Sequence, residues 1–264
     1  MRSIKNTRTN KSMGGNKMFK IQLENAQNFK KCVNTLNTLI DEGKFKINEE
    51  GIRLRAMDPS QIAMVSFYMP KQAFREFEVE EDEIQLNLND LNDRTKTARS
   101  SDSLNLELDE SSSRLKIDFQ GKVEREFDLP LLNLSENGVN EPSIDFDTEI
   151  KINGSTLKDI LSDANLVASH VKIISKSDEL EVKAEGDKGN LKTTISKDED
   201  VILDYDVNEE QTAIFPIEYL KDLLVGATSK SIVTLNLKTN NPLKLKYGIG
   251  EATLTYYLAP RVEE

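Results

Sequence analysis

The sequence is poor in cysteine and histidine and has no long apolar run, and each shortage excludes a class of protein. Cys32 is the only cysteine among the 264 residues, so the chain can form neither an internal disulfide framework nor a cysteine-based metal site. This usage fits a reducing cytosol, and we expect a cytoplasmic protein. No run approaches the roughly 20 apolar residues that span a membrane, and the first 17 residues lack the apolar centre of a signal peptide.

The residues that enzymatic catalysis needs are also scarce. His170 is the only histidine, so any serine or cysteine triad would have to recruit it. It follows a predicted helix end, where the helix dipole favours a cation, and we assign it a structural role. Cys32 lies on an apolar helical face and is a poor candidate for a nucleophile. The sequence has no glycine-rich nucleotide-binding motif, and residues 186–189 are typical of a turn between strands.

Acidic residues cluster at positions 78–83 and 198–200, and such clusters can hold a divalent cation. A metal-assisted carboxylate hydrolase is therefore the alternative from the enzyme class. Solvated loop charge is the commoner origin of such clusters. We therefore predict a protein that is not an enzyme and that has no catalytic residue, no metal and no cofactor.

The charge balance is acidic, with 46 acidic residues against 35 basic ones and a net charge of −11. The first 17 residues carry five basic residues and no acid, which leaves −16 for residues 18–264. A body of this charge argues against binding nucleic acid through a broad basic face, although a local basic stripe stays possible. Residues 1–17 are predicted to be a disordered basic tail, or an over-extended start before Met18 as the true first residue.

Residues 131–145 read as an extended connector between two similar parts of the chain. Pro130 and Pro142 lie near its ends, and Asn137 and Gly138 give a turn signal within it. Its apolar residues follow neither a helical nor a strand period, which predicts an extended segment lying on a surface. We therefore expect domains at 18–130 and 146–264, with the connecting loop 131–145 between them.

The two parts repeat one plan of strand, helix and further strands, and each part contains it twice. The predicted strand-to-helix junctions fall at Asn25, Asn89, Asn153 and Phe215, at intervals of 64, 64 and 62 residues. Such a fourfold internal repeat, with four helices against about sixteen strands, predicts an α+β fold of antiparallel sheets with the helices on one face.

Individual helix boundaries follow from capping residues. Asn89 is predicted to cap a second helix over 91–99, which we expect to be short and loosely held because polar residues interrupt its apolar face. Asn153 opens the third helix, and Pro216 occupies the first turn of the fourth. A strand is predicted over 123–127.

Two motifs carry a resemblance to a known family. Residues 51–64 read GIRLRAMDPSQIAM, and residues 254–264 read LTYYLAPRVEE. Both resemble the DNA sliding clamp of archaea and eukaryotes, proliferating cell nuclear antigen, in its archaeal style. The resemblance extends over residues 18–264, and it agrees with the internal repeat and the connector.

This resemblance implies a closed homotrimeric ring of six domains of the DNA-clamp fold, each of two β-α-β-β-β units, with helices lining the hole and antiparallel sheets outside. Such a ring encircles double-stranded DNA without sequence preference and acts as a processivity factor in replication and repair, associated with the nucleoid. The implied partners are DNA polymerase, clamp loader, flap nuclease and DNA ligase, each recruited through a short peptide that has a glutamine anchor and two aromatic residues. One subunit of a heterotrimeric clamp stays open as an alternative.

The resemblance also implies three sets of residues. The DNA-facing set comprises Lys30, Lys31, Lys96, Lys158 and Lys221. Polar or acidic residues stand where the family commonly has basic ones, at Asn37, Asp93, Asp159, Ser162 and Glu218. The partner-peptide pocket comprises Met57, Gln61, Ile62, Met64, Val139, Pro142, Phe146, Pro242, Tyr257, Ala259 and Pro260. The subunit interface, on edges at 122–127 and 190–197, comprises Lys122, Val123, Glu124, Phe127, Leu191, Lys192, Thr194 and Ile195, with Glu126 and Lys197 adding charge.

Overall fold

The computed structural model describes residues 19–109, 113–133 and 138–261, so the predicted tail over 1–17 lies outside the described residues. The first part of the chain contains β1 (Lys20–Leu23), α1 (Gln27–Asn37), β2 (Glu42–Asn48), β3 (Gly51–Met57), β4 (Ala63–Pro70), η1 (Lys71–Ala73), β5 (Glu76–Glu78), β6 (Asp82–Asn87), α2 (Leu88–Thr95), β7 (Ser103–Asp109), β8 (Arg114–Gln120) and β9 (Arg125–Pro130). The second contains β10 (Thr148–Asn153), α3 (Gly154–Ala164), β11 (His170–Ser175), β12 (Glu179–Gly186), β13 (Gly189–Ser196), β14 (Ile202–Val207), β15 (Gln211–Pro216), α4 (Ile217–Leu223), β16 (Ile232–Asn236), β17 (Leu243–Ile249) and β18 (Ala252–Leu258).

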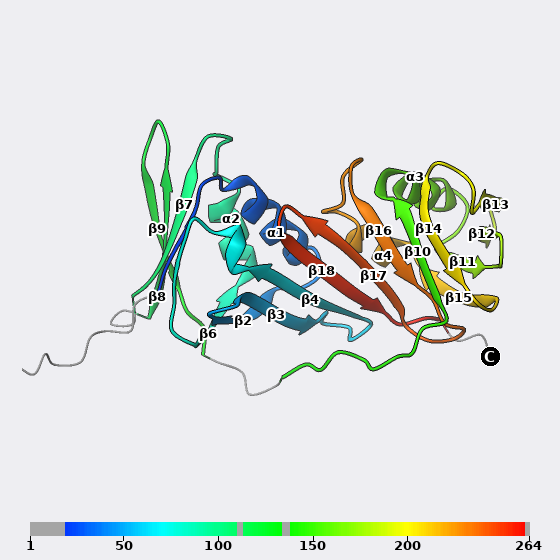
Figure 1. The fold of residues 1–264 in the computed structure, drawn as a ribbon, viewed down its shortest axis with the longest axis horizontal. Coiled ribbons are helices and arrows are strands. Elements are labelled where there is room, and N and C mark those ends of the chain that lie inside the picture. The colour runs from blue at the N-terminus through cyan, green and yellow to red at the C-terminus, as the bar shows by residue number, and fades with distance from the viewer. Residues whose placement is uncertain (1–18, 110–112, 134–137, 262–264) are drawn as a thin grey trace, which may run out of the picture.

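These strands form three sheets whose assigned pairings are all antiparallel, as the alternating patterns predict. A five-stranded sheet has the order β5-β1-β7-β8-β9, and a four-stranded sheet has the order β13-β12-β11-β15. Between them runs a nine-stranded sheet, β14-β10-β16-β17-β18-β4-β3-β2-β6, which crosses from one part of the chain to the other where β18 pairs with β4. Figure 1 shows the connector, from residue 138 onward, along the side of the molecule away from α1 and α3.

Among the described helices, α2 and α3 begin after an asparagine cap, whereas α1 and α4 follow Ala26 and Pro216 without a side-chain cap bond. Asn153 caps α3 as predicted, because its side chain accepts a hydrogen bond from the amide of Ser155 at 3.0 Å. The prediction for α2 was wrong by one half-turn, since Asn87 and not Asn89 is the cap, and the helix ends at Thr95. Pro216 is the residue before α4 instead of a member of its first turn.

The second helix is short but is not loosely held. Leu88, Leu91 and Thr95 are each at most 1% exposed, so its inner face is as buried as those of the other helices. The hydroxyl of Thr95 donates to the carbonyl of Asn92 at 3.2 Å, which satisfies the polar group inside the core. Arg94 turns outward and pairs with Asp90 at 2.6 Å. The polar residues that suggested weak packing are therefore accommodated within the helix itself.

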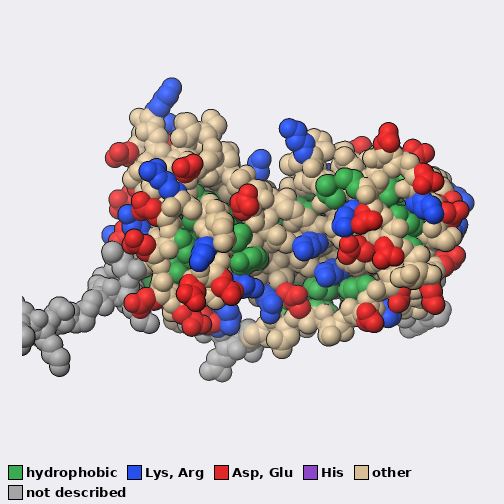
Figure 2. Space-filling model, in the orientation of Figure 1, with side chains coloured by type: hydrophobic (Ala, Val, Ile, Leu, Met, Phe, Trp, Pro, Cys, Tyr) green, Lys and Arg blue, Asp and Glu red, His purple; other side chains and the backbone are tan. Residues whose placement is uncertain are grey.

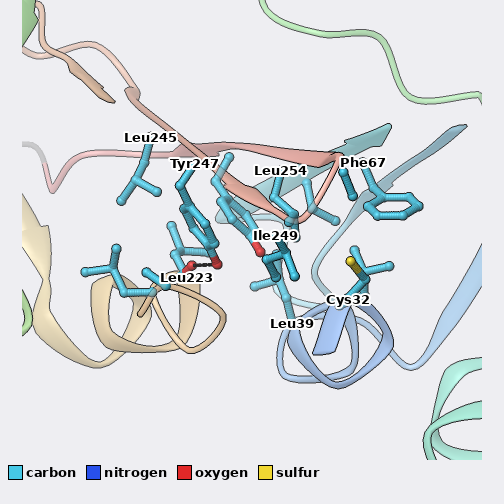
Figure 3. Packing of buried hydrophobic residues seen from close by; sticks show 14 of the residues in the cluster. Cys32, Leu39, Phe67, Leu223, Leu245, Tyr247, Ile249 and Leu254 are labelled. Carbon is cyan, nitrogen blue, oxygen red and sulfur yellow. Dashed lines mark hydrogen bonds between the residues drawn. The ribbon is translucent and has the colours of Figure 1, made fainter. Parts of the chain in front are cut away.

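One hydrophobic core runs through both parts of the chain. Figure 3 shows its centre, where Cys32 of α1 lies below Phe67 of β4, and Tyr247 of β17 points to Leu223 of α4. The Tyr247 hydroxyl donates to the Leu223 carbonyl at 2.7 Å. At Gly226, just after α4, a Cβ atom would lie 2.5 Å from the hydroxyl of Thr35 on α1, so only glycine permits this approach between the two parts.

The predicted strand over 123–127 begins later than expected. Residues 121–124 form the turn between β8 and β9, and exposed Val123 lies outside the strand, as do Lys122 and Glu124. The cause is the buried carboxylate of Asp102. Gly121 leaves room for it, because a Cβ there would lie 2.2 Å from an Asp102 oxygen, and Arg125 pairs with it where β9 starts.

Candidate functional surfaces

In its middle, the connector is fastened to the outer face of the nine-stranded sheet through the carboxylate of Glu141. Glu141 accepts a hydrogen bond from the Ser66 hydroxyl at 2.6 Å and pairs with the Arg55 Nε at 3.1 Å. Burial and the nearby charge of Glu141 raise the pKa of Tyr257. These three partners come from β3, β4 and β18, which are neighbours in the sheet, so the connector crosses the point where the two parts of the chain join.

The loop after β3 is built around a second carboxylate, Asp58, which is 4% exposed. Its oxygens accept hydrogen bonds from the amides of Ser60, Ile62 and Ala63 at 3.0, 2.7 and 2.7 Å. The hydroxyl of Tyr219 on α4 donates to it at 3.0 Å. Asp58 therefore fixes the shape of the loop and ties it to a helix of the other part of the chain.

The structure brings much of the predicted partner-peptide pocket together. Met57, Met64 and Tyr257 are directly paired across β3, β4 and β18 and so form one row. Met57 is half-buried, whereas Met64 and Tyr257 are 2% and 6% exposed. The amide of Ala259 donates to the carbonyl of Ile62 at 2.9 Å, which joins the end of β18 to the Asp58 loop.

Other pocket residues are peripheral to that row. Ile62 is 36% exposed, and Gln61 is exposed with a positive φ of 58°. Pro242 precedes Leu243, which is paired with the end of β18, and Pro260 follows that strand. Half-buried Pro142 and Phe146 follow Val139 along the connector. Val139 itself lines a cleft of about 320 Å³ over β2 and β3, so the structure places it beside basic residues, next to the methionine row and not within it.

The predicted DNA-facing lysines divide into two kinds. Lys30 on α1 donates to the carbonyls of Lys96 and Ala98, beyond the end of α2, at 2.8 and 3.0 Å. Lys158 on α3 donates to the carbonyl of Ala227, beyond the end of α4, at 2.5 Å. Burial lowers the pKa of Lys158. The internal repeat thus extends to a side-chain contact, in which a lysine of one helix caps the end of the next.

The remaining candidates on the helices are nearer to solvent. Lys31 is exposed, Lys96 lies 3.4 Å from Asp93, and Lys221 lies 3.3 Å from Glu218. On the face shown in Figure 2, acidic and basic side chains are interspersed over the whole molecule. Asn37 is half-buried, and Asp159 and Ser162 are exposed. None of these three residues adds positive charge to the helices.

Two sheet edges correspond to the predicted subunit interface. β9 and β13 each end their sheet, and β13, with eight residues, is the longest edge strand among the described residues. Leu191, Lys192, Thr194 and Ile195 all lie in β13, although Ile195 is 7% exposed and faces the core. Phe127 is half-buried in β9. Lys122, Val123 and Glu124 belong to the preceding turn, so the edge itself begins at Arg125.

Charge on these two edges is opposite in sign. On β13 and its neighbours, Lys192, Lys183 and Lys172 follow one another across three strands. Lys183 and Lys192 approach the buried carboxylate of Glu181 at 2.5 and 2.8 Å, and with Lys176 they hold the pKa of Glu181 down to about 2. On the other edge, Glu126 is exposed and lies opposite Asp118 of β8.

Cys32 and His170, the two groups considered for catalysis, lie within α1 and β11. Cys32 is 1% exposed, and burial raises the pKa of its thiol to about 12. Burial and the charge of Arg261 lower the pKa of His170, which disfavours the cation that was expected there. Glu78 and Glu83 lie within β5 and β6 instead of a loop. Across the described ranges, no group of three or more His, Cys, Asp or Glu side chains could hold a metal ion.

The described helices do not include one that is long and apolar enough to cross a membrane. Sequence reasoning missed Glu141 and Tyr219, because their partners lie 75 and 161 residues away and no local pattern marks them. The basic lining of the cleft had a readable signal. Lysines alternate in β2 and arginines alternate in β3, and alternation places each pair on one face of its strand.

The repeat of helices over antiparallel sheets, with a connector across the outer face, defines a two-part clamp fold. Residues 18–137 match the family described as proliferating cell nuclear antigen, N-terminal domain, and residues 140–262 match its C-terminal domain. The chain therefore belongs to the proliferating cell nuclear antigen family.

Individual relatives agree with this placement. The chain is 37% identical to the DNA polymerase sliding clamp of Thermococcus gammatolerans and 35% identical to that of Pyrococcus furiosus, covering 93% of this chain and 99% of each relative. The crystal structure of PCNA from Thermococcus kodakaraensis superposes with a TM-score of 0.88 at 27% identity, over 92% of this chain and 100% of that one. A. fulgidus PCNA bound to the C-terminal region of FEN-1 shares the fold, with a TM-score of 0.84 at 24% identity over 93% of this chain and 99% of that one.

Proposed function

We propose that this chain is a DNA polymerase sliding clamp, a processivity factor without catalytic activity that closes into a homotrimeric ring around duplex DNA in the cytoplasm. The observation that carries the proposal is the match to both family domains along nearly the whole chain, together with relatives of that name. A ring holds DNA by enclosing it, so the acidic balance of −11 is compatible with this function. Binding by a broad basic face would not be.

The opposite charges of the two sheet edges support a ring made of identical subunits. If β9 of one copy pairs with β13 of the next, the acidic row at Glu126 meets the basic row at Lys192. Such exposed pairs contribute a few tenths of a kcal/mol each, so they select register and partner more than they hold the ring. The paired backbone and half-buried Phe127 and Leu191 would supply most of the stability.

On the DNA side, Lys31, Lys96 and Lys221 are the lysines that we assign to phosphate contact. Lys30 and Lys158 contribute charge to the same helices, but their amino groups also bond to carbonyls. Contact with DNA is therefore expected to be weak and exchangeable, which suits a protein that moves along the duplex.

The test of the ring is the mass of the purified chain in solution, measured by light scattering across a dilution series at low and moderate salt. A stable mass of three chains is the expected result. A monomer or dimer at every concentration would contradict the homotrimer. It would favour the alternative of one subunit in a heterotrimeric clamp, which the thin basic lining also suggests.

On the outer face, we propose that the row of Met57 and Met64 with the Asp58 loop receives short peptides of replication and repair enzymes, namely DNA polymerase, clamp loader, flap nuclease and DNA ligase. Methionine adapts to varied side chains, and aromatic anchors supply most of the binding free energy in such sites. Changing Met57→Ala with Ile62→Ala should weaken the binding of a partner peptide more than tenfold while the ring mass is unchanged. Leu203→Ala, an exposed apolar residue on β14, is the matched control. Unaltered affinity in the double variant would show that the pocket lies elsewhere.

A further inference from the structure

A cleft lies between the connector and the outer face of β2 and β3. Its volume is about 320 Å³, and Gly138, Val139 and Asn140 of the connector form one wall. Among the described residues of the lining, the charged ones lie on the other wall and are all basic, namely Lys44, Lys46, Arg53 and Arg55. Such a gathering of cations is unexpected on a chain of net charge −11.

Strand pairing explains how these four cations come together, and also why they are costly. Lys46 lies directly opposite Arg53, and Lys44 and Arg55 flank the adjacent pair of Phe45 and Leu54. Like charges placed opposite each other destabilise a sheet. An arrangement of this kind on an outer face therefore indicates a binding role more than a folding role.

Several carboxylates among the described residues approach these cations. Glu83 is shared by Lys44 and Lys46, at 2.6 and 2.8 Å, and Glu50 approaches Arg53 at 2.6 Å. The fourth cation, Arg55, takes its carboxylate from the connector, at Glu141. These ion pairs lie at half-exposed positions, where they exchange readily with solvent and with other anions.

We propose that this cleft binds an acidic segment flanking the partner peptide, so that the clamp prefers partners whose peptide motif is followed or preceded by Asp and Glu. The seat of Glu141 on Arg55 and Ser66 shows how a carboxylate is received at this face. The inference rests on the proposed function, because the peptide motif itself would occupy the neighbouring row of Met57 and Met64.

An extended peptide fits the cleft better than a nucleic-acid strand does. Residues 138–140 belong to no strand, so their backbone groups can pair with an extended chain that lies between them and β3. A phosphate backbone longer than the cleft would meet the carboxylates of Glu50 and Glu83 at its rim. A short run of acidic side chains can place its charges between these carboxylates.

The experiment compares labelled peptides that share one core, with a glutamine anchor and two aromatic residues, and that carry four Glu or four Gln residues at either end. Binding to the full chain is followed by fluorescence anisotropy at about 50 mM and about 500 mM salt. For at least one end, the Glu peptide should bind about three- to tenfold more tightly than its Gln counterpart at low salt. At high salt the ratio should fall below about twofold because exposed charges are screened.

In the double variant Lys46→Gln with Arg53→Gln, the Glu and Gln peptides should bind equally tightly. The affinity of the Gln peptides should be the same as in the unmodified chain. The matched control is Lys151→Gln with Lys246→Gln, two cations that belong to the same nine-stranded sheet and do not line the cleft. A control that lost the ratio equally would overturn the assignment to the cleft.

The outcomes separate this inference from the peptide pocket. If all peptides bind equally, the acidic preference is refuted and the pocket stands. If only the Glu peptides bind, the cleft is supported and the pocket is refuted, and if none binds, both are refuted. A competition experiment compares a single-stranded oligothymidylate with a free Glu-rich peptide. If the oligothymidylate displaces the Glu flank more effectively, the cleft belongs to nucleic acid and the proposal is overturned.

Discussion

The loop around Asp58 makes a quantitative prediction, because its hydrogen bonds can be removed in steps. Tyr219→Phe removes only the bond from α4, and hydrogen bonds to charged groups contribute about 1.5–3 kcal/mol. Because Tyr219 is half-buried, we expect the lower end, a loss of about 1–2 kcal/mol in the free energy of unfolding. Asp58→Ala removes that bond and three backbone bonds together.

The larger change is expected to cost about 2–5 kcal/mol, because the amide of fully buried Ala63 is also left without its acceptor at a cost of about 1–3 kcal/mol. The amides of Ser60 and Ile62 lie in an exposed loop and can turn to water. Urea unfolding at one fixed protein concentration measures both variants, since ring assembly makes stability depend on concentration. Asp187→Ala, in an exposed turn, serves as the control and should change nothing.

The same variants test the link from this loop to function. Asp58→Ala should also weaken peptide binding, because Gln61 and Ile62 lose their fixed position, whereas Tyr219→Phe should weaken it less. If Asp58→Ala destabilised the protein no more than Tyr219→Phe does, the backbone bonds of Asp58 would not hold the loop, and the reasoning would be wrong.

Two further predictions concern the edge formed by β13. Thr194→Pro removes a backbone donor from the strand and should leave a folded monomer. Thr193→Pro is made as well, because successive amides point to opposite sides of a strand. A trimer that survived both changes would rule out this edge. The pKa of Glu181 is lowered from 4.5 to about 2, so its contribution to stability is complete above pH 4.5 and is lost as the pH falls towards 2. Melting temperatures should therefore fall less steeply across this range in Glu181→Gln than in the unmodified chain, and parallel curves would contradict the ion cluster.

Local patterns predicted the elements better than their ends. Asn153 sits directly before an apolar helical face and was correctly identified as a cap. For α2 two asparagines compete, and the choice of Asn87 follows from the length of β6 and its pairing with β2, which the sequence does not display. Val123 fits an alternating strand, but the turn is set by the buried Asp102, to which Arg125 is bound.

The candidate pocket was predictable mainly where the family motifs lie. Met57, Met64 and Tyr257 come from those two motifs, and the structure places them in one row. The fastening of the connector by Glu141 is a contact between residues distant in the chain, and it depends on the twist and register of the sheet. Neither the twist nor the register of the sheet can be read from composition or periodicity.

The nine-stranded sheet has a mechanical consequence for any ring built from this chain. Six residue pairs join β18 to β4, and the same core packs beneath them, so bending between the two parts would break a continuous ladder. In the proposed ring, contacts between separate copies would be made by strand edges and exposed charge, which can part and re-form. Each subunit should therefore behave as a stiff arc, and the opening through which DNA enters should be a gap between neighbouring copies.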